Sequence, residues 1–234
     1  MCTVTYLPLG NNDFILTSNR DEDPKRNTIE PQKYIEDNVE LFYPKDSLAG
    51  GTWIGISGKD RLVCLLNGGL KNHIKKSKYK HSRGIIVKQL LTSDDAVRYV
   101  ENLDLTNIEP FTIVLVDWNN GLEAYELVWT GEEKVFEKLS HEPHIWSSST
   151  LYDAEMKQQR KRWFADWLKE REVFEQSDIL NFHQNENLGC RATSIKMKRE
   201  RVETVSTTSV LKNKEEVSLK YIDYVAEEVS RLLV

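Results

Sequence analysis

The sequence predicts an α+β protein in which antiparallel sheets and helices occupy separate parts of the chain. Three observations predict this class: strand-like runs come in hairpin pairs, helical periodicity is confined to a few stretches, and further strand-like runs follow them. A chain of 234 residues that is 39% hydrophobic and 29% charged is long and apolar enough to bury a core. No repeat or long low-complexity linker divides it, so we expect one domain, residues 1–234.

The first predicted hairpin joins residues 2–7 and 14–18, which are enriched in Thr, Val, Tyr, Phe and Ile. Residues 10–13 supply the turn, with the sequence Gly-Asn-Asn-Asp. The return of the second strand brings the segment after Ser18 back beside the start of the chain. Residues 23–47 are polar and contain three prolines, so we expect mostly loop there, with no more than a short edge strand.

The middle of the chain predicts a second hairpin, two helices and a meander. Residues 53–57 and 61–66 form the hairpin around a Gly-Lys-Asp turn. Residues 84–103 have the apolar spacing of two helices in series, with a Ser-Asp-Asp break that caps the second helix. Three strand-like runs separated by turn residues then predict the meander: residues 111–117, 122–129 and 134–138.

The last third begins with a long amphipathic helix, predicted from Asp153 to about Glu172 because its aromatic residues share one stripe. A weaker helix is expected at residues 177–182. We predict a final helix over residues 224–233. Between these helices the sequence returns to strand-like character in three runs: residues 192–197, 204–211 and 217–221.

Charge and hydropathy exclude two classes of partner. The formal net charge of −5 argues against nucleic-acid binding, which needs a concentrated basic surface. Basic residues do gather between Lys71 and Arg83, where we favour a solvated loop over a segment that attracts an anion. No apolar run reaches membrane-spanning length, and the beginning of the sequence lacks the pattern of a signal peptide. We expect no nucleic-acid partner and no integral membrane segment.

Cysteine usage points to a reducing compartment, and we predict a cytoplasmic protein. Cys2, Cys64 and Cys190 are widely separated and do not form a disulfide framework in a chain of this length. The sequence has no C-x-x-C and no H-E-x-x-H spacing. We therefore predict no structural metal and no cofactor.

Cys2 is the candidate nucleophile. A small second residue permits removal of Met1, which leaves a thiol and a free α-amine on the same residue. An α-amine titrates near ~8 and a thiol near ~8.5, so the amine can accept the thiol proton during attack on a carbonyl. The alternative is that Cys2 is a small buried hydrophobic residue without reactivity.

Four features follow each other along the chain: Met1-Cys2-Thr3, the tetrad Asn19-Arg20-Asp21-Glu22, the glycine-rich run from Gly50 to Gly55, and Asn67. Together they resemble the NRDE family, which includes transport and Golgi organisation protein 2. The resemblance covers most of the chain. It implies an N-terminal-nucleophile (Ntn) hydrolase fold, a four-layer αββα sandwich of two antiparallel sheets flanked by helices, related to penicillin V acylase and bile-salt hydrolase.

The resemblance also implies roles for single residues. Cys2 would be the nucleophile, with its own α-amine as the base, and Asp21 would accept hydrogen bonds from that ammonium or from the thiol. Arg20 would either lower the pKa of the thiol and pair with Asp21, or bind a substrate carboxylate. Asn67 resembles the oxyanion-hole asparagine, whose N–H meets the negative charge on the attacked carbonyl.

Three further positions belong to the expected site. Asn19 and Trp53 are expected to support it or to bind substrate, although a turn residue and a core residue would look the same in sequence. Ser149 stands where the relatives have a second oxyanion asparagine, and a hydroxyl donates one hydrogen bond and reaches less far than an amide. The late arginine of the amidase relatives has no counterpart here, because its aligned position falls near Val205 and Arg201 is out of register.

The sequence leaves three functions open. The motif set favours an enzyme that cleaves or transfers the acyl group of a small non-peptide amide or acyl compound through a thioester on Cys2. The changed oxyanion position favours a non-catalytic carrier that holds a small molecule such as haem or an acyl lipid in the same pocket. In the third function, the chain is an interaction scaffold whose motif residues are structural.

Overall fold

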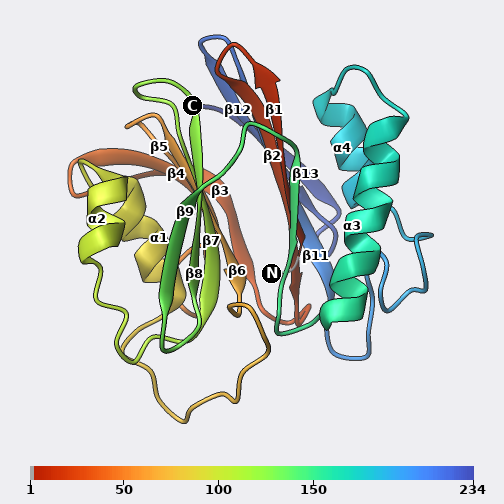
Figure 1. Cartoon of the computed structure of the whole chain (residues 1–234), viewed down its shortest axis with the longest axis horizontal. Helices are drawn as coiled ribbons and strands as arrows, with labels where there is room; N and C mark the ends of the chain where they lie inside the picture. Colours follow the sequence, from red (N-terminus) through yellow and green to blue (C-terminus); the bar gives the residue numbers. More distant parts are fainter. Residues whose placement is uncertain (1–2) are drawn as a thin grey trace. The chain divides into compact units, whose positions relative to one another are not determined.

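The computed structural model describes residues 3–234, which form two compact units (Figure 1). The first unit combines the residues up to Arg26 with residues 142–233, and the second contains residues 27–141. Each unit is built on one antiparallel sheet and carries two helices, as the α+β prediction requires. The assignment of residues 1–234 to a single domain stays a prediction.

The first unit has a six-stranded sheet in the order β10-β1-β2-β11-β12-β13. Its helices are α3 (Ala154–Lys169) and α4 (Gln176–His183), and both lie along this sheet in Figure 1. The predicted hairpin of β1 and β2 is confirmed, and its turn residues Asn11 and Asn12 have φ of 52° and 65°. The strands are β1 (Thr3–Gly10), β2 (Asp13–Glu22), β10 (His144–Ser147), β11 (Glu203–Asn213), β12 (Glu216–Asp223) and β13 (Glu228–Leu233).

The two faces of β2 serve different purposes because successive strand residues point to opposite sides of the sheet. On the helix side, Ile15 packs with Phe164, Trp167 and Ile179 in a cluster of buried aromatic and aliphatic side chains. The same side, further along the strand, turns polar toward its end. The amphipathic stripe predicted for α3 is thus confirmed as core.

The second unit has a seven-stranded sheet in chain order, β3-β4-β5-β6-β7-β8-β9. Its helices, α1 (Arg83–Thr92) and α2 (Ala96–Asn102), follow the two-helix prediction, with Asp95 accepting the Arg98 N–H as the N-cap of α2. The predicted hairpin and meander are confirmed. The strands are β3 (Thr28–Glu36), β4 (Val39–Asp46), β5 (Ile54–Ser57), β6 (Arg61–Asn67), β7 (Phe111–Asp117), β8 (Glu123–Trp129) and β9 (Lys134–Lys138).

The glycine-rich run before β5 has a packing role. A Cβ on Gly84, at the start of α1, would lie 2.8 Å from the Thr52 carbonyl oxygen and 3.2 Å from the Cα of Gly51. Gly50 has a φ of 68°, which an L side chain rarely adopts. The run therefore lets the backbone pass the first turn of α1 at a distance that side chains would prevent.

The prediction of mostly loop over residues 23–47 was wrong, because β3 and β4 form a hairpin there. Its turn is the pair Asp37 and Asn38, with φ of 48° and 62°, a signal that the prolines obscured. Pro31 lies where the β3–β4 register shifts, between Ile29 and Gln32. An irregular site on an edge strand tolerates a residue without an N–H.

Two predictions in the last third of the chain also fail, and one strand was not predicted. Residues 224–233 are not helical: β13 pairs with β12 as an edge strand, and Glu227 turns the chain with a φ of 59°. Residues 192–197 form turns in place of a strand. The short strand β10 was not predicted, because pairing with β1 decides it and its own sequence does not.

Candidate active site in the first unit

Asp21 lies at the end of β2 and is only 3% exposed. The Tyr152 hydroxyl donates to its Oδ2 at 3.0 Å, and the Thr204 hydroxyl donates to its Oδ1 at 2.6 Å. Thr204 reaches it from β11, directly across the sheet. These two donors fix the carboxylate, and a carboxylate oxygen can accept more than one hydrogen bond, including one from a cationic donor.

Arg20 is 2% exposed and leaves β2 on the face opposite to Asn19 and Asp21. Its Nη1 donates to the Arg26 carbonyl oxygen at 3.3 Å, and Ser206 is its cross-strand neighbour. The alternation starts the side chains of Arg20 and Asp21 on different sides of the strand. The role of Arg20 stays a prediction.

Asn19 is completely buried, and its amide makes four hydrogen bonds. Its Nδ2 donates to the carbonyl oxygens of His183 and Ile195, both at 3.0 Å. Its Oδ1 faces His183 Nδ1 at 3.0 Å and accepts from the Thr207 hydroxyl at 2.8 Å. The side chain is therefore fully used in joining β2 to α4, the segment before β11 and β11 itself, which fits the supporting role.

His183 completes this buried network. Burial first, and then the charge of Arg160, lower its pKa to about 3, so the imidazole is neutral at neutral pH. Because its Nδ1 faces the Asn19 oxygen, Nδ1 carries the proton and Nε2 accepts from the Thr5 hydroxyl at 2.8 Å. The imidazole thus acts as a fixed spacer between β1, β2 and α4.

Tyr152 and Arg160 were missed by the sequence analysis, and both are buried, at 2% and 1% exposure. The guanidinium of Arg160 stacks on the Tyr152 ring, 3.7 Å from its centroid, and that of Arg199 lies 5.3 Å from the same centroid. The only sequence signal was one arginine inside the apolar stripe of the α3 helix. A charge at such a position needs specific partners.

Ser149 lies in the turn that links β10 to α3 and is 5% exposed. Lys157 Nζ, on the first half of α3, donates to its Oγ at 2.6 Å. Thr3 and Ser147 are register partners, so the turn starts beside the first described residues of β1. The Lys157 ammonium therefore occupies one of the two acceptor positions of the Ser149 hydroxyl.

The remaining expected site residues are Asn67 and Trp53, which belong to the second unit, and Cys2, which is outside the described residues. Asn67 ends β6, and the following Gly68 has a φ of 85° and donates its N–H to the Pro110 carbonyl at 3.0 Å. Trp53 is 2% exposed and its carbonyl accepts the Leu65 N–H at 2.7 Å. Among the predicted residues, the first unit holds Asn19, Arg20, Asp21 and Ser149.

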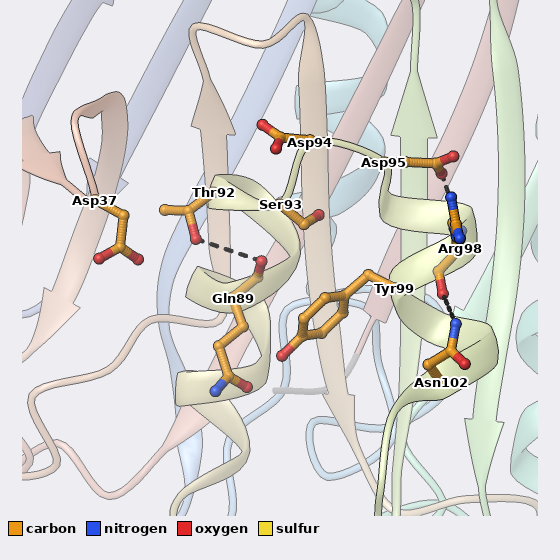
Figure 2. A pocket seen from close by; sticks show the side chains of 9 residues that line it. All are labelled: Asp37, Gln89, Thr92, Ser93, Asp94, Asp95, Arg98, Tyr99 and Asn102. Carbon is orange, nitrogen blue, oxygen red and sulfur yellow. Dashed lines mark hydrogen bonds between the residues drawn. The ribbon is translucent and has the colours of Figure 1, made fainter.

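A separate hollow of about 600 Å³ lies at the junction of α1 and α2 in the second unit (Figure 2). Several of its polar groups are already used by the helices: Asp95 caps Arg98, and Asn102 donates to the Arg98 carbonyl at 2.8 Å. The Lys59 ammonium lowers the pKa of Asp94 by a hydrogen bond. The polar groups that line this hollow thus serve mainly to end α1 and to begin α2. Its lining residues are Asp37, Gln89, Thr92, Ser93, Asp94, Asp95, Arg98, Tyr99 and Asn102.

Two properties of the described chain bear on ligand classes. Within residues 3–234, His, Cys, Asp and Glu side chains nowhere gather in the groups of three that a metal ion would need. None of the helices in this range combines the length and the apolar character required to cross a membrane.

Solved structures of similar fold include a hydrolase, an amidase and an acylase. Conjugated bile acid hydrolase from Clostridium perfringens matches with a TM-score of 0.63 and 11% identity, over 99% of this chain and 92% of that one. An N-acylethanolamine-hydrolyzing acid amidase orthologue from Caenorhabditis elegans matches with a TM-score of 0.61 and 12% identity, over 90% and 92%. Penicillin V acylase from Agrobacterium tumefaciens matches with a TM-score of 0.57 and 11% identity, over 99% and 86%. The TM-scores show the Ntn-hydrolase fold, and identities of 11–12% support nothing finer.

Sequence comparison supplies the family. No curated protein matches the chain directly. The sequence profile of the family described as Transport and Golgi organisation 2 matches residues 1–227, and it confirms the resemblance that the NRDE tetrad and its companion motifs indicated. The chain belongs to the Transport and Golgi organisation 2 family.

Proposed function

We propose that the protein is a cysteine Ntn hydrolase or acyltransferase that acts on a small non-peptide amide or acyl compound. The observation that carries this proposal is the buried Asp21 carboxylate, fixed by two hydroxyl donors at the end of the strand that pairs with β1. The likeness in fold to amidases and acylases supports it. The proposed nucleophile, Cys2, directly precedes β1 in the sequence.

In the proposed reaction, the α-amine of Cys2 takes the thiol proton and the sulfur attacks the carbonyl carbon. Asp21 holds the resulting ammonium. The ammonium then protonates the leaving nitrogen as the carbon–nitrogen bond breaks, which leaves an acyl thioester on Cys2. The neutral α-amine takes a proton from the water or acceptor amine that attacks the thioester, and it returns this proton to the sulfur as the carbon–sulfur bond breaks.

Charge on the attacked oxygen would be met by the Ser149 hydroxyl, while the oxyanion role of Asn67 stays a prediction of the family resemblance. Lys157 supports the Ser149 donor, because an ammonium that bonds to Ser149 Oγ at 2.6 Å draws electron density from the hydroxyl. Arg20, on the other face of β2, is our candidate for binding an acidic group of the substrate. As part of this proposal the protein works in the cytoplasm, where its thiols stay reduced.

Intact mass spectrometry of untagged protein tests the proposal. The sample is measured before and after incubation with an acyl-thioester or β-lactam probe, and the modified cysteine is located in peptides. We expect loss of Met1 and one acyl group on Cys2, absent from Cys2→Ala. Retained Met1 together with an unreactive Cys2 would contradict the proposal.

Cys190 provides the matched control for that experiment. It is exposed, and a hydrogen bond from the Thr193 side chain, followed by backbone donors, lowers the pKa of its thiol. General thiol reactivity would therefore label Cys190 as well. A Cys190→Ser variant should keep the full acylation of Cys2, whereas Cys64 is buried and should stay unlabelled in the folded protein.

A non-catalytic carrier is the second candidate, favoured by the hydroxyl of Ser149 in place of an amide. It would hold haem or an acyl lipid without forming a thioester. Binding of haem or of a fluorescent fatty acid that persists in Cys2→Ala, with no product from a panel of amides and acyl thioesters, would support the carrier and count against catalysis.

A further inference from the structure

Arg160 is a buried cation on the inner side of α3 whose contacts converge on the proposed site. Its Nε and Nη2 donate to the Thr193 carbonyl at 3.3 and 3.0 Å, and Nη2 also donates to the Ser194 carbonyl. Its Nη1 donates to the Thr3 hydroxyl. The plane of the guanidinium covers the ring of Tyr152.

These contacts satisfy the donors of Arg160 with neutral groups. Among residues 3–234, its hydrogen-bond partners are two carbonyls and one hydroxyl, and Asp21 is reached only through the Tyr152 phenol. Removing an ion from water costs several kcal/mol, so an apolar side chain would serve packing alone at lower cost. The position therefore calls for the charge or for the forked geometry of arginine.

Both ends of this contact set are parts of the proposed site. Thr3 follows Cys2 in the chain and lies between Asn19 on β2 and Ser147 on β10. Tyr152 donates to Asp21 at 3.0 Å. The Arg160 guanidinium thus contacts both Thr3, at the start of β1, and Tyr152, whose hydroxyl donates to Asp21.

We propose that Arg160 is a positioning residue of the Cys2 site, which sets the start of β1 through Thr3 and holds the Tyr152 hydroxyl on Asp21. Its positive charge also favours the thiolate and the negative oxygen that form during acyl transfer. The inference rests on the proposed function.

The charged and titratable groups around Arg160 allow the effect to be measured through pH. From α4, His183 is neutral, since its pKa is about 3, and from β2 Asp21 provides a negative charge. Arg199 stacks over the Tyr152 ring, and Lys157 lies one turn earlier on α3. Between pH 6 and 9 the thiol and amine of Cys2 are therefore the groups whose titration Arg160 should influence.

The test compares Arg160→Met, Arg160→Lys and Tyr152→Phe with the wild-type chain. Arg162→Met is the matched control, because Arg162 is on the same helix but exposed. For each protein we measure the rate of Cys2 acylation by the acyl-thioester probe and the pH midpoint of its alkylation by iodoacetamide.

We expect Arg160→Met to slow Cys2 acylation by roughly 10²-fold, the order expected when reacting groups are misplaced by about 1 Å. Its alkylation midpoint should rise by roughly one pH unit, because a nearby cation favours the thiolate. Arg160→Lys keeps the charge but not the fork, so it should restore the midpoint more than the rate. Tyr152→Phe should slow acylation about tenfold, while Arg162→Met should keep the wild-type rate and midpoint.

A purely structural role would lower the melting temperature of Arg160→Met and leave the rate and midpoint at wild-type values, and that result would overturn the inference. If Arg160→Met does not fold, Arg160→Lys and Tyr152→Phe decide: wild-type kinetics in both would overturn it. The proposed function fails separately, when Cys2 of the wild-type chain takes no acyl group, and the inference then fails with it. Normal acylation of the wild type with unaffected variants rejects the role of Arg160 alone.

Discussion

The central strands of the two units bury different kinds of side chain. In the second unit, β6 and β7 bury mostly aliphatic residues, and α1 packs Ile86, Val87, Leu90 and Leu91 with the same unit. In the first unit, β2 and β11 bury hydroxyls, an amide and charges. The buried polar residues of these two strands are Thr17, Ser18, Asn19, Arg20, Asp21, Thr204, Ser206, Thr207, Thr208, Ser209 and Lys212.

This difference separates the work of the two sheets. Aliphatic burial stabilises in proportion to area and tolerates exchange between residues of similar volume. A buried polar network is stabilising only when each group has its partner, and it then fixes one arrangement. Asn19 and Asp21 of the first unit are bonded in this way and are therefore held in defined positions, as a site requires, whereas the second unit is organised mainly for stability.

The largest effect should come from the Asp21→Asn change in the first unit. An amide cannot hold the Cys2 ammonium as a carboxylate does, so acylation by the thioester probe should fall by roughly 10²- to 10⁴-fold. The matched change in the second unit is Asp117→Asn, which weakens the 2.8 Å pair with Arg61. Equal loss of activity in both variants would show that the contrast between the units is wrong.

Leu90→Ala tests the apolar side of the comparison. Leu90 is completely buried on α1, so the variant should lower the free energy of unfolding by about 2–5 kcal/mol. Urea titration measures this loss, and the acylation rate well below the transition should stay unchanged. A stable variant with lost acylation would contradict the assignment of α1 to stability.

His183 makes the stability of the first unit depend on pH. Its pKa is lowered to about 3 from 6.5, so between these two values the imidazole binds a proton in the unfolded chain and not in the folded chain. Stability contributed by the neutral imidazole is therefore complete above pH 6.5 and falls toward pH 3, at up to about 1.4 kcal/mol per pH unit. Urea unfolding at pH 7, 6 and 5 should show this decline in the wild type and a smaller one in His183→Gln. Parallel curves for the two proteins would refute it.

Ser149→Asn should have the smallest effect, and a positive one. The amide offers two donors and a longer reach than the hydroxyl, so acylation of Cys2 should increase by up to about tenfold. Thr150→Asn, the neighbouring change in the same turn, should leave the rate as it is. No gain in Ser149→Asn would argue that this position does not face the reacting oxygen.

Much of the fold could be predicted because the signals are local. The β1–β2 hairpin has its own turn residues, Asn11 and Asn12, and α3 has an apolar stripe and the N-cap Asp153, whose side chain accepts the Met156 N–H. The strands β3 and β13 were missed for a different reason. Both are exposed edge strands with weak alternation, so the partner strand decides the conformation.

For the site, the motif residues were visible in sequence and their surroundings were not. The NRDE tetrad pointed to Asn19, Arg20 and Asp21. No local sequence pattern indicated that Asn19 forms hydrogen bonds with groups 164 to 188 residues away, or that Arg160 contacts Thr3 across 157 residues.

The sequence by itself determined the class of fold, the family and the candidate site residues, because turn types, periodicity and motifs are properties of neighbouring residues. The tertiary structure alone decided which buried groups hold them: Tyr152 and Thr204 on Asp21, and His183 on Asn19. A buried polar atom must find a partner, and the arrangement of strands and helices determines which distant residue lies within 3 Å of it.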